Sequence, residues 1–248
     1  MVLRKYLKSG SPLKRCLFKL IEEIDYRLAD TVLTVCEYMI SENNLQKYKS
    51  RVVSLFVDTN KFTDRISFHN RRYEIGFVGR LDRAKGILNF LKALEALNGN
   101  PNVIIIGDGE EKNSVLSKIQ ILKSTNKLDV TYIDWIENAK LPNYLNEIKV
   151  VVVPSYKEGL PNVVLESMAC GCVVLATPVG GIPAVIKDEQ TGFIMEDNCP
   201  ACIARNVIRA LSHPNLGKIV RNARALIEQE CTFKRAVKRY RNILASLK

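Results

Sequence analysis

Short apolar segments alternate with longer segments of mixed polarity after residue 70. The apolar segments lie at residues 73–78, 102–107, 130–134, 150–154 and 173–177, each followed by a helical pattern or a loop. Residues 103–106 are all valine or isoleucine, so both faces of this segment are apolar. Such segments are typical of strands in a parallel sheet that helices cover on both sides. We therefore predict an α/β fold with a Rossmann-like, doubly wound parallel sheet over residues 73–230.

The regions on either side of this alternation are predicted from helical spacing and from helix breakers. The chain from residue 200 onward is predicted to be helical, with breaks near 213–214 and 230–232 and a final helix within 231–248. Residues 1–60 predict a smaller α/β part, and residues 61–72 predict a linker. Within this smaller part we expect a helix, a strand, a second helix after Cys36 and Glu37, and a short strand, at residues 13–28, 31–35, 37 onward and 52–56.

One motif places two carboxylates after the predicted strand at 150–154. The sequence E-G-L-P-N-V-V-L-E spans residues 158–166 and crosses the start of the next helix. Gly159 lets a backbone approach a ligand, and Pro161 suits a helix's first turn. Free N–H groups at such a helix start can hold a diphosphate. The alternative interpretation is that Glu158 and Glu166 are ordinary solvated carboxylates.

A second motif places two cations after the predicted strand at 73–78. Arg80 and Lys85 belong to the sequence G-R-L-D-R-A-K-G at residues 79–86. Ligands of open α/β sheets bind at the carboxyl ends of the strands, so both cations are expected to meet the same diphosphate. The alternative is a solvated turn, because arginine and lysine are usually exposed.

Five segments in this order resemble the retaining glycosyltransferases of family four (glycosyl transferases group 1), which have the GT-B fold. The resemblance covers the nucleotide-sugar-binding half of such enzymes. The matching segments are G-R-L-D-R-A-K-G at 79–86, I-I-G-D-G-E at 105–110, V-V-V-P-S-Y-K-E-G-L-P-N-V-V-L-E at 151–166, A-C-G-C-V-V-L-A-T-P-V-G-G-I-P at 169–183 and T-G-F-I-M at 191–195.

The resemblance implies a role for each matching residue. Arg80 and Lys85 would bind the donor diphosphate, and Glu158 would face the donor sugar and its phosphate. Glu166 would accept hydrogen bonds from the ribose hydroxyls. The implied catalytic residues are Glu158, Arg80 and Lys85. The implied donor-binding residues are Gly79, Arg80, Lys85, Glu158, Gly159, Leu160, Pro161, Asn162 and Glu166.

The implied chemistry is sugar transfer from a nucleotide-sugar, a UDP- or GDP-sugar, with retention of configuration. No two aspartates stand in a D-x-D pair, so no metal and no cofactor are expected. Arg80, Lys85 and a helix N-terminus would neutralise the charge on the leaving diphosphate. The donor phosphate itself is one candidate base, and Glu158 is not interpreted as a nucleophile. A glycan or a lipid-linked molecule is the expected acceptor.

The resemblance also implies a complete first Rossmann-like domain, whereas residues 1–60 match only the end of one. The final helix, within 231–248, is expected to pack back on this N-terminal part. Three explanations remain open: a partner chain or self-association supplies the missing surface, the gene is a decayed fragment, or a reduced enzyme works as it is. A non-catalytic nucleotide-binding or interaction subunit is the alternative to a transferase.

The charge balance favours anionic partners. The 248 residues carry 37 basic and 26 acidic side chains, a net charge of +11. Nucleic acid is not expected, because aromatic residues are few and do not alternate with the basic residues. Residues 4–19 and 233–248 predict basic amphipathic helices. Each either docks its apolar side on the protein or binds an anionic membrane surface.

Composition agrees with a cytoplasmic protein, with peripheral attachment to the inner membrane face as the alternative. No segment approaches the ~20 apolar residues that cross a bilayer, and the N-terminus lacks the apolar stretch of a signal peptide. Seven scattered cysteines suit a reducing compartment. Cys199 and Cys202 alone have metal or redox spacing, and two buried or half-buried thiols at a helix start are the favoured interpretation. Cys170 and Cys172 are expected to pack at a helix-to-strand turn.

Overall fold

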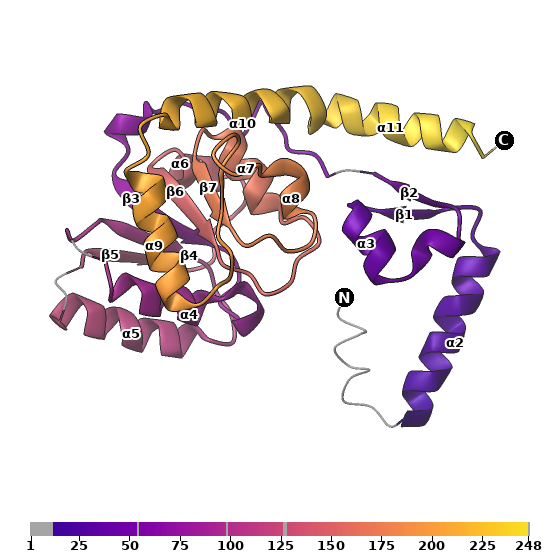
Figure 1. Ribbon diagram of the computed structural model, residues 1–248, viewed down its shortest axis with the longest axis horizontal. Coiled ribbons are helices and arrows are strands. Elements are labelled where there is room, and N and C mark those ends of the chain that lie inside the picture. Colours follow the sequence, from indigo (N-terminus) through magenta and orange to yellow (C-terminus); the bar gives the residue numbers. More distant parts are fainter. Residues whose placement is uncertain (1–11, 54, 98, 126–127, 248) are drawn as a thin grey trace.

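The structure is a computed structural model that describes residues 12–53, 55–97, 99–125 and 128–247. Figure 1 shows a larger α/β region and, beside it, a smaller one near the N-terminus. The strands of the described residues form two sheets, one with six strands and one with two. All strand pairings within these sheets are parallel.

The larger sheet has the strand order β5-β4-β3-β6-β7-β8. The predicted strands are confirmed with small shifts at their ends, and the last strand falls within the T-G-F-I-M segment. The largest shift is in β6, which begins two residues before the predicted range. The strands are β3 (Tyr73–Val78), β4 (Val103–Ile106), β5 (Val130–Ile133), β6 (Ile148–Val153), β7 (Val173–Ala176) and β8 (Phe193–Ile194).

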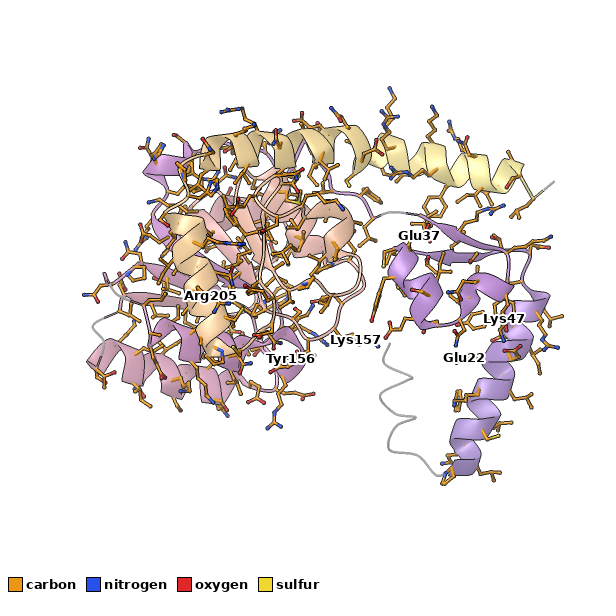
Figure 2. The ribbon with its side chains drawn as sticks, viewed as in Figure 1. Glu22, Glu37, Lys47, Tyr156, Lys157 and Arg205 are labelled. Atoms are coloured by element: carbon orange, nitrogen blue, oxygen red, sulfur yellow. The ribbon has the colours of Figure 1, made fainter. Side chains whose placement is uncertain are left out.

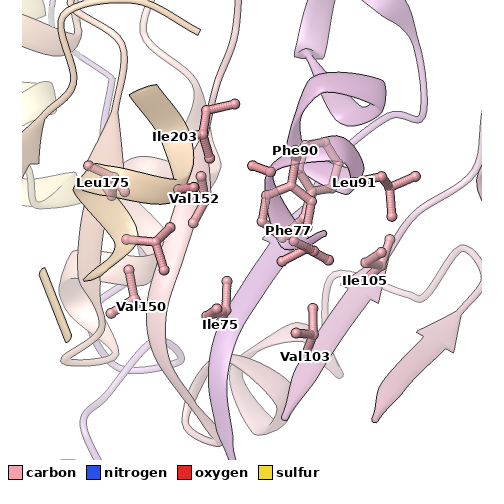
Figure 3. Packing of buried hydrophobic residues seen from close by; sticks show 14 of the residues in the cluster. Ile75, Phe77, Phe90, Leu91, Val103, Ile105, Val150, Val152, Leu175 and Ile203 are labelled. Atoms are coloured by element: carbon pink, nitrogen blue, oxygen red, sulfur yellow. The ribbon is translucent and has the colours of Figure 1, made fainter. Parts of the chain in front are cut away.

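Helices cover both faces of this sheet, so the predicted doubly wound α/β class is confirmed. Val103 and Ile105 of β4 belong to one buried apolar cluster, whereas Ile104 and Ile106 belong to the other. Figure 3 shows part of the first cluster, in which Phe77 and Phe90 pack together. The helices of this region are α4 (Ile87–Leu94), α5 (Lys112–Thr125), α6 (Leu141–Leu145), α7 (Asn162–Ala169), α8 (Ile182–Val185), α9 (Pro200–Leu211) and α10 (Leu216–Glu230).

The smaller region, here called the N-terminal unit, contains the two-stranded sheet. It consists of α2 (Pro12–Leu28), β1 (Val32–Thr34), α3 (Glu37–Glu42), a 3-10 turn (Leu45–Lys47) and β2 (Ser50–Val52). The prediction of a strand at 52–56 is wrong by several residues. The parallel register pairs Val32 with Ser50 and Thr34 with Val52, so pairing ends where the chain turns away.

Most of the apolar side of α2 is exposed, so the first of the two interpretations of this basic segment, that the helix docks its apolar side on the protein, is not confirmed. Six of its apolar side chains are between 44% and 80% exposed, namely Leu13, Leu17, Leu20, Ile21, Ile24 and Leu28. Phe18 is half-buried, and the ring of Tyr26 lies 5.2 Å from that of Tyr48. The part of the predicted basic stretch at residues 4–11 lies outside the described residues. This exposure distinguishes the N-terminal unit from the larger region.

The last helix, α11 (Phe233–Ala245), begins beside the segment that leaves the N-terminal unit. The backbone N–H of Val57 donates to the carbonyl of Cys231 at 2.9 Å, and the rings of Phe56 and Phe233 lie 5.2 Å apart. In Figure 1 α11 extends from the larger region toward the N-terminal unit. The breaks that precede α10 and α11 lie where the sequence predicts them. The domain boundaries at 60, 72 and 230 stay a prediction.

Arg71 fixes the predicted linker to the larger region. Its side chain is buried, and it donates to Asp64 at 2.8 Å and to the carbonyls of Ile148 and Cys170 at 2.8 and 2.7 Å. Charge-assisted bonds of this kind hold a buried guanidinium in one geometry. The chain between residues 64 and 71 is therefore part of the larger region's packing.

No helix among the described residues is long and apolar enough to cross a membrane.

Candidate functional site

A pocket of about 330 Å³ opens at the carboxyl ends of β3 and β6. Its walls come from both predicted motifs and from the last residues of β3 and β6. Seven of the predicted site residues line it, namely Gly79, Arg80, Lys85, Glu158, Pro161, Asn162 and Glu166. Gly159 and Leu160 are not among the lining residues, and Leu160 is buried.

The turn that carries Lys85 depends on a glycine. Gly86 has a left-handed φ of 73°, and a Cβ at this position would lie 2.0 Å from the carbonyl oxygen of Pro154. Only glycine permits this close approach. The N–H of Tyr156 also donates to the carbonyl of Ala84 at 2.9 Å. Together these contacts bring the loop after β3 against the loop after β6.

Lys85 and Glu158 form an ion pair in the pocket as a result. Lys85 Nζ lies 2.5 Å from Glu158 Oε1, and the two side chains are 23% and 9% exposed. Ser155 Oγ donates to the same carboxylate oxygen at 2.7 Å. Sequence reasoning missed Ser155, although its place directly after a buried strand was the available signal. The lysine ammonium is thus held at a fixed position at the sheet edge.

Arg80 is placed differently from Lys85. Arg80 Nη2 lies 2.7 Å from Asp82 Oδ2, and its side chain is 64% exposed. Asp82 Oδ1 also accepts the backbone N–H of Lys85 at 2.9 Å, so this aspartate shapes the turn. Asp82 lies within the quoted motif, but sequence reasoning gave it no role. Arg80 therefore lies at the rim of the pocket and Lys85 inside it.

The N-terminus of α7 forms another wall. Pro161 is the N-cap residue rather than part of the first turn as predicted, and no side chain caps the helix. Asn162 and Val163, the first residues of α7, line the pocket. The first amides of a helix lack intrahelical acceptors and carry partial positive charge. This wall therefore presents a site for an anion.

Glu166 lies half-buried one turn further along α7. Burial raises the pKa of Glu166 above its ordinary value, against the opposing effects of the hydrogen bond from Asn138 and the charge of Lys61. Asn138 Nδ2 donates to Glu166 Oε1 at 3.1 Å, and Lys61 in turn donates to Asn138 Oδ1. Sequence reasoning missed Asn138 and Lys61, which lie in loops far from the motifs. The carboxylate keeps acceptor capacity for a further donor.

The N-terminal unit contacts the loop that carries Glu158, and none of its described residues is among those that line the pocket. The loop after β7 packs on the same segment. Gly180 in this loop has a φ of 62°, and a Cβ there would lie 2.1 Å from the carbonyl oxygen of Glu158. Cys36 Sγ lies 3.9 Å from the Gly159 carbonyl oxygen. Lys157, labelled in Figure 2, forms an ion pair with Glu42 of α3.

No group of three or more His, Cys, Asp or Glu side chains in the described part of the chain is arranged as metal ligands would be. The expectation that no metal is needed stays a prediction.

Comparison with known proteins identifies glycosyltransferases among the relatives of this chain. The family described as glycosyl transferases group 1 matches residues 58–226. An uncharacterized glycosyltransferase of Methanocaldococcus jannaschii is 29% identical over 184 residues, which are 71% of this chain and 46% of that protein. A Campylobacter jejuni N-acetylgalactosaminyltransferase, named for an undecaprenol-linked acceptor, is 26% identical over 223 residues, which are 86% of this chain and 59% of that protein. The chain thus spans about half the length of these curated relatives.

Solved structures share the fold. Anabaena HepE in complex with UDP-glucose matches with a TM-score of 0.77 and 20% identity, over 91% of this chain and 65% of that one. The C-terminal domain of the group 1 protein LpcC from Francisella tularensis matches with a TM-score of 0.64 and 26% identity, over 71% of this chain and 99% of that one. The match with HepE covers a larger share of this chain than the match with LpcC. The fold similarity therefore extends beyond a C-terminal domain alone.

Proposed function

The chain belongs to the group 1 glycosyl transferases, and we propose that its pocket binds a nucleotide-sugar and that the protein transfers the sugar with retention of configuration. The observation that carries this proposal is the convergence of Lys85, Glu158, Glu166 and the uncapped start of α7 on one pocket. A cation, a helix N-terminus and an acceptor carboxylate are what a diphosphate joined to a ribose requires.

In this proposal the diphosphate lies between Lys85 and the start of α7. The ammonium of Lys85 already occupies a fixed position, because Glu158 and Ser155 hold the other side of the ion pair. The first amides of α7 supply further donors from the opposite wall. Arg80 at the rim adds a weaker contribution, because its side chain is exposed and paired with Asp82.

Glu166 is proposed to accept hydrogen bonds from the ribose hydroxyls. Its half-buried carboxylate carries a desolvation cost that one bond from Asn138 offsets only in part, as the raised pKa indicates. Two hydroxyl donors would offset this cost further, since bonds to an ionised acceptor are the stronger ones. Binding of a ribose would thus recover part of the free energy that burial of Glu166 costs the folded protein.

The proposed transfer breaks the bond between the anomeric carbon and the diphosphate oxygen. Negative charge grows on the departing diphosphate, and Lys85 with the α7 amides stabilises it. The acceptor hydroxyl forms the new bond on the same face of the sugar, and its proton passes to the diphosphate oxygen. Glu158 positions Lys85 and faces the sugar in this scheme. A metal and a cofactor have no role in it.

The acceptor is proposed to be a glycan or a lipid-linked molecule. The name of the Campylobacter relative contains an undecaprenol diphosphate acceptor, and that of a Bacillus subtilis relative contains teichuronic acid biosynthesis. We propose that a second polypeptide or a second copy contributes to the acceptor side. The exposed apolar residues of α2 and the neighbouring two-stranded β1–β2 sheet form the surface that this second chain is proposed to contact.

A second candidate function is nucleotide binding without transfer, as a regulatory or interaction subunit. The pocket favours it, because every residue that lines the pocket lies between Phe77 and Glu166, within the larger region. Both candidates require the same pocket, and they differ in whether sugar is transferred once acceptor and a completing chain are supplied.

Calorimetric titration of the full chain with UDP, GDP and ADP tests the proposal. One diphosphate is expected to bind, and Glu166→Ala is expected to weaken that binding because it removes the acceptor of the ribose bonds. Glu228→Ala is the matched control, since Glu228 is a half-exposed carboxylate on α10 that pairs only with Arg224 among the contacts described. If no diphosphate binds to the folded chain, the proposed site is wrong.

A further inference from the structure

The sequence Cys199-Pro200-Ala201-Cys202 lies at the start of α9, outside the proposed pocket. Cys199 is the N-cap residue, and its sulfur accepts the backbone N–H of Cys202 at 3.4 Å. The two cysteines are therefore one helical turn apart, with their side chains at the same end of the helix. No role in sugar transfer requires this pair.

The two thiols differ in exposure. Cys199 is exposed, which corrects the expectation that both thiols are covered, whereas Cys202 is 2% exposed. An exposed thiol is open to attack an external disulfide, and a buried neighbour is open only to its own partner. This asymmetry divides the pair into an attacking and a resolving cysteine.

A carboxylate lies against the buried thiol. Cys202 Sγ donates to Glu196 Oε2 at 2.9 Å. Burial raises the pKa of Cys202, and so does its hydrogen bond to Glu196. The same hydrogen bond is the main cause that lowers the pKa of Glu196 to about 2. Asn206 Nδ2 and Arg205 Nη2 donate to Cys202 Sγ at 3.4 and 3.6 Å, and Arg205 lies on α9 (Figure 2). Glu196 therefore favours the protonated thiol of Cys202, whereas Asn206 and Arg205 are the donors available to a thiolate.

We propose that Cys199 and Cys202 form a reversible dithiol–disulfide site that exchanges with low-molecular-weight disulfides such as glutathione disulfide. The Cys199 thiolate attacks one sulfur of glutathione disulfide, and one glutathione thiolate leaves. Cys202 then loses its proton to solvent and attacks Cys199 Sγ of the mixed disulfide as a thiolate, so that the second glutathione leaves. The pair loses two electrons and two protons, and glutathione disulfide becomes two glutathione molecules.

Cys16 provides an internal comparison. It is exposed like Cys199, but no second cysteine stands at this spacing from it. Cys36, Cys170, Cys172 and Cys231 are buried. A mixed disulfide on Cys16 should therefore persist, whereas one on Cys199 should be resolved by Cys202.

The test treats the full folded chain with glutathione disulfide, quenches with acid and alkylating agent, and maps the peptides by mass spectrometry. The expected product is a Cys199–Cys202 disulfide, lacking two hydrogens and carrying no glutathione, beside a glutathione adduct on Cys16. Added dithiol should restore both sites. A wild-type chain that retains glutathione on Cys199, or leaves Cys199 unmodified while Cys16 reacts, overturns the proposal.

Three variants separate the steps. Cys202→Ser should stop the reaction at a glutathione adduct on Cys199, and Cys199→Ser should abolish both products while keeping an N-cap acceptor. Glu196→Gln should leave adduct formation unchanged and speed disulfide closure, because the carboxylate raises the pKa of Cys202 and so disfavours its thiolate. A slower closure in this variant would contradict the effect assigned to Glu196. Because Cys202 is buried, circular dichroism of each variant verifies its fold, and Cys202→Ala repeats the test with a smaller polar change.

Discussion

The two parallel sheets of this chain differ in what covers them. The six-stranded sheet buries both faces under helices, and side chains such as Ile75 and Val150 have no exposed surface. The two-stranded sheet of the N-terminal unit buries few apolar residues, and α2 leaves Leu13 and Leu28 about four-fifths exposed. A two-stranded sheet is marginal in water unless other elements pack on it. The larger region therefore buries the apolar side chains of its own sheet, whereas the N-terminal unit leaves apolar side chains exposed.

The same comparison separates binding from the rest of the proposed reaction. Every residue that lines the pocket lies between Phe77 and Glu166, within the larger region. The N-terminal unit contacts the larger region at Lys157 and Gly159, in the loop that carries Glu158. Donor binding should then depend on the larger region alone, and transfer should depend on what covers the N-terminal unit.

The largest expected effect comes from breaking the packing of the larger region at Arg71. Arg71→Met removes the bonds to Asp64 and to the carbonyls of Ile148 and Cys170, and leaves these acceptors without their donor. The free energy of unfolding should fall by about 3 to 5 kcal/mol, measured by urea denaturation. Arg72→Met is the matched control, because Arg72 is exposed. Equal losses for both variants would contradict the structural role of Arg71.

A smaller effect is expected from removing the pocket cation. Lys85→Met should weaken binding of a nucleoside diphosphate roughly 10- to 100-fold, because a charge-assisted contact is lost. Arg80→Met should weaken it less, since Arg80 is 64% exposed and already paired. Calorimetry measures both, and an Arg80 effect larger than the Lys85 effect would contradict the proposed placement of the diphosphate.

The pH dependence of stability tests the burial of Glu166. Its folded-state pKa is raised, so its stabilising contribution is complete below the unfolded-state pKa and is lost as pH rises through the folded-state pKa. Glu166→Gln removes this loss. The melting temperature of the variant should therefore gain on that of the wild type between about pH 4 and about pH 7. A difference that stays constant over this interval would show that Glu166 is not desolvated.

The smallest expected effect is on the exposed side of α2. Replacing Leu13 and Leu28 by serine should change the free energy of unfolding by no more than ~0.5 kcal/mol, because both side chains are exposed. Leu45→Ala, in the same unit but 3% exposed, should cost about 2 to 5 kcal/mol. A large loss in the serine variant would show that another surface, such as a second copy, covers α2 in solution.

The fold of the larger region was predictable because its strands are apolar on both faces. The all-valine and all-isoleucine segments leave little choice of element, and their spacing leaves room for crossover helices. The end of β2 was not predictable, because the apolar run continues after Val52 and only the pairing with Thr34 ends the strand. The exposed side of α2 was equally hidden, since an amphipathic pattern does not say what its apolar side contacts.

The pocket was predictable where its residues belong to motifs and not elsewhere. Lys85, Glu158 and Glu166 follow strands at one sheet edge, so parallel topology brings them together. Asn138 and Lys61 reach Glu166 from loops whose course depends on tertiary packing. The left-handed turn at Gly86 decides that Lys85 meets Glu158, and its dependence on Pro154 is visible only in three dimensions.

The measurement that tests the central claim most directly is hydrogen–deuterium exchange of the full chain with and without saturating UDP or GDP. Binding in the proposed pocket should slow exchange at residues 79–86 and 158–166 and leave α2 unchanged. Protection confined to other segments, or no protection with either nucleotide, would contradict the claim that the larger region carries the donor site.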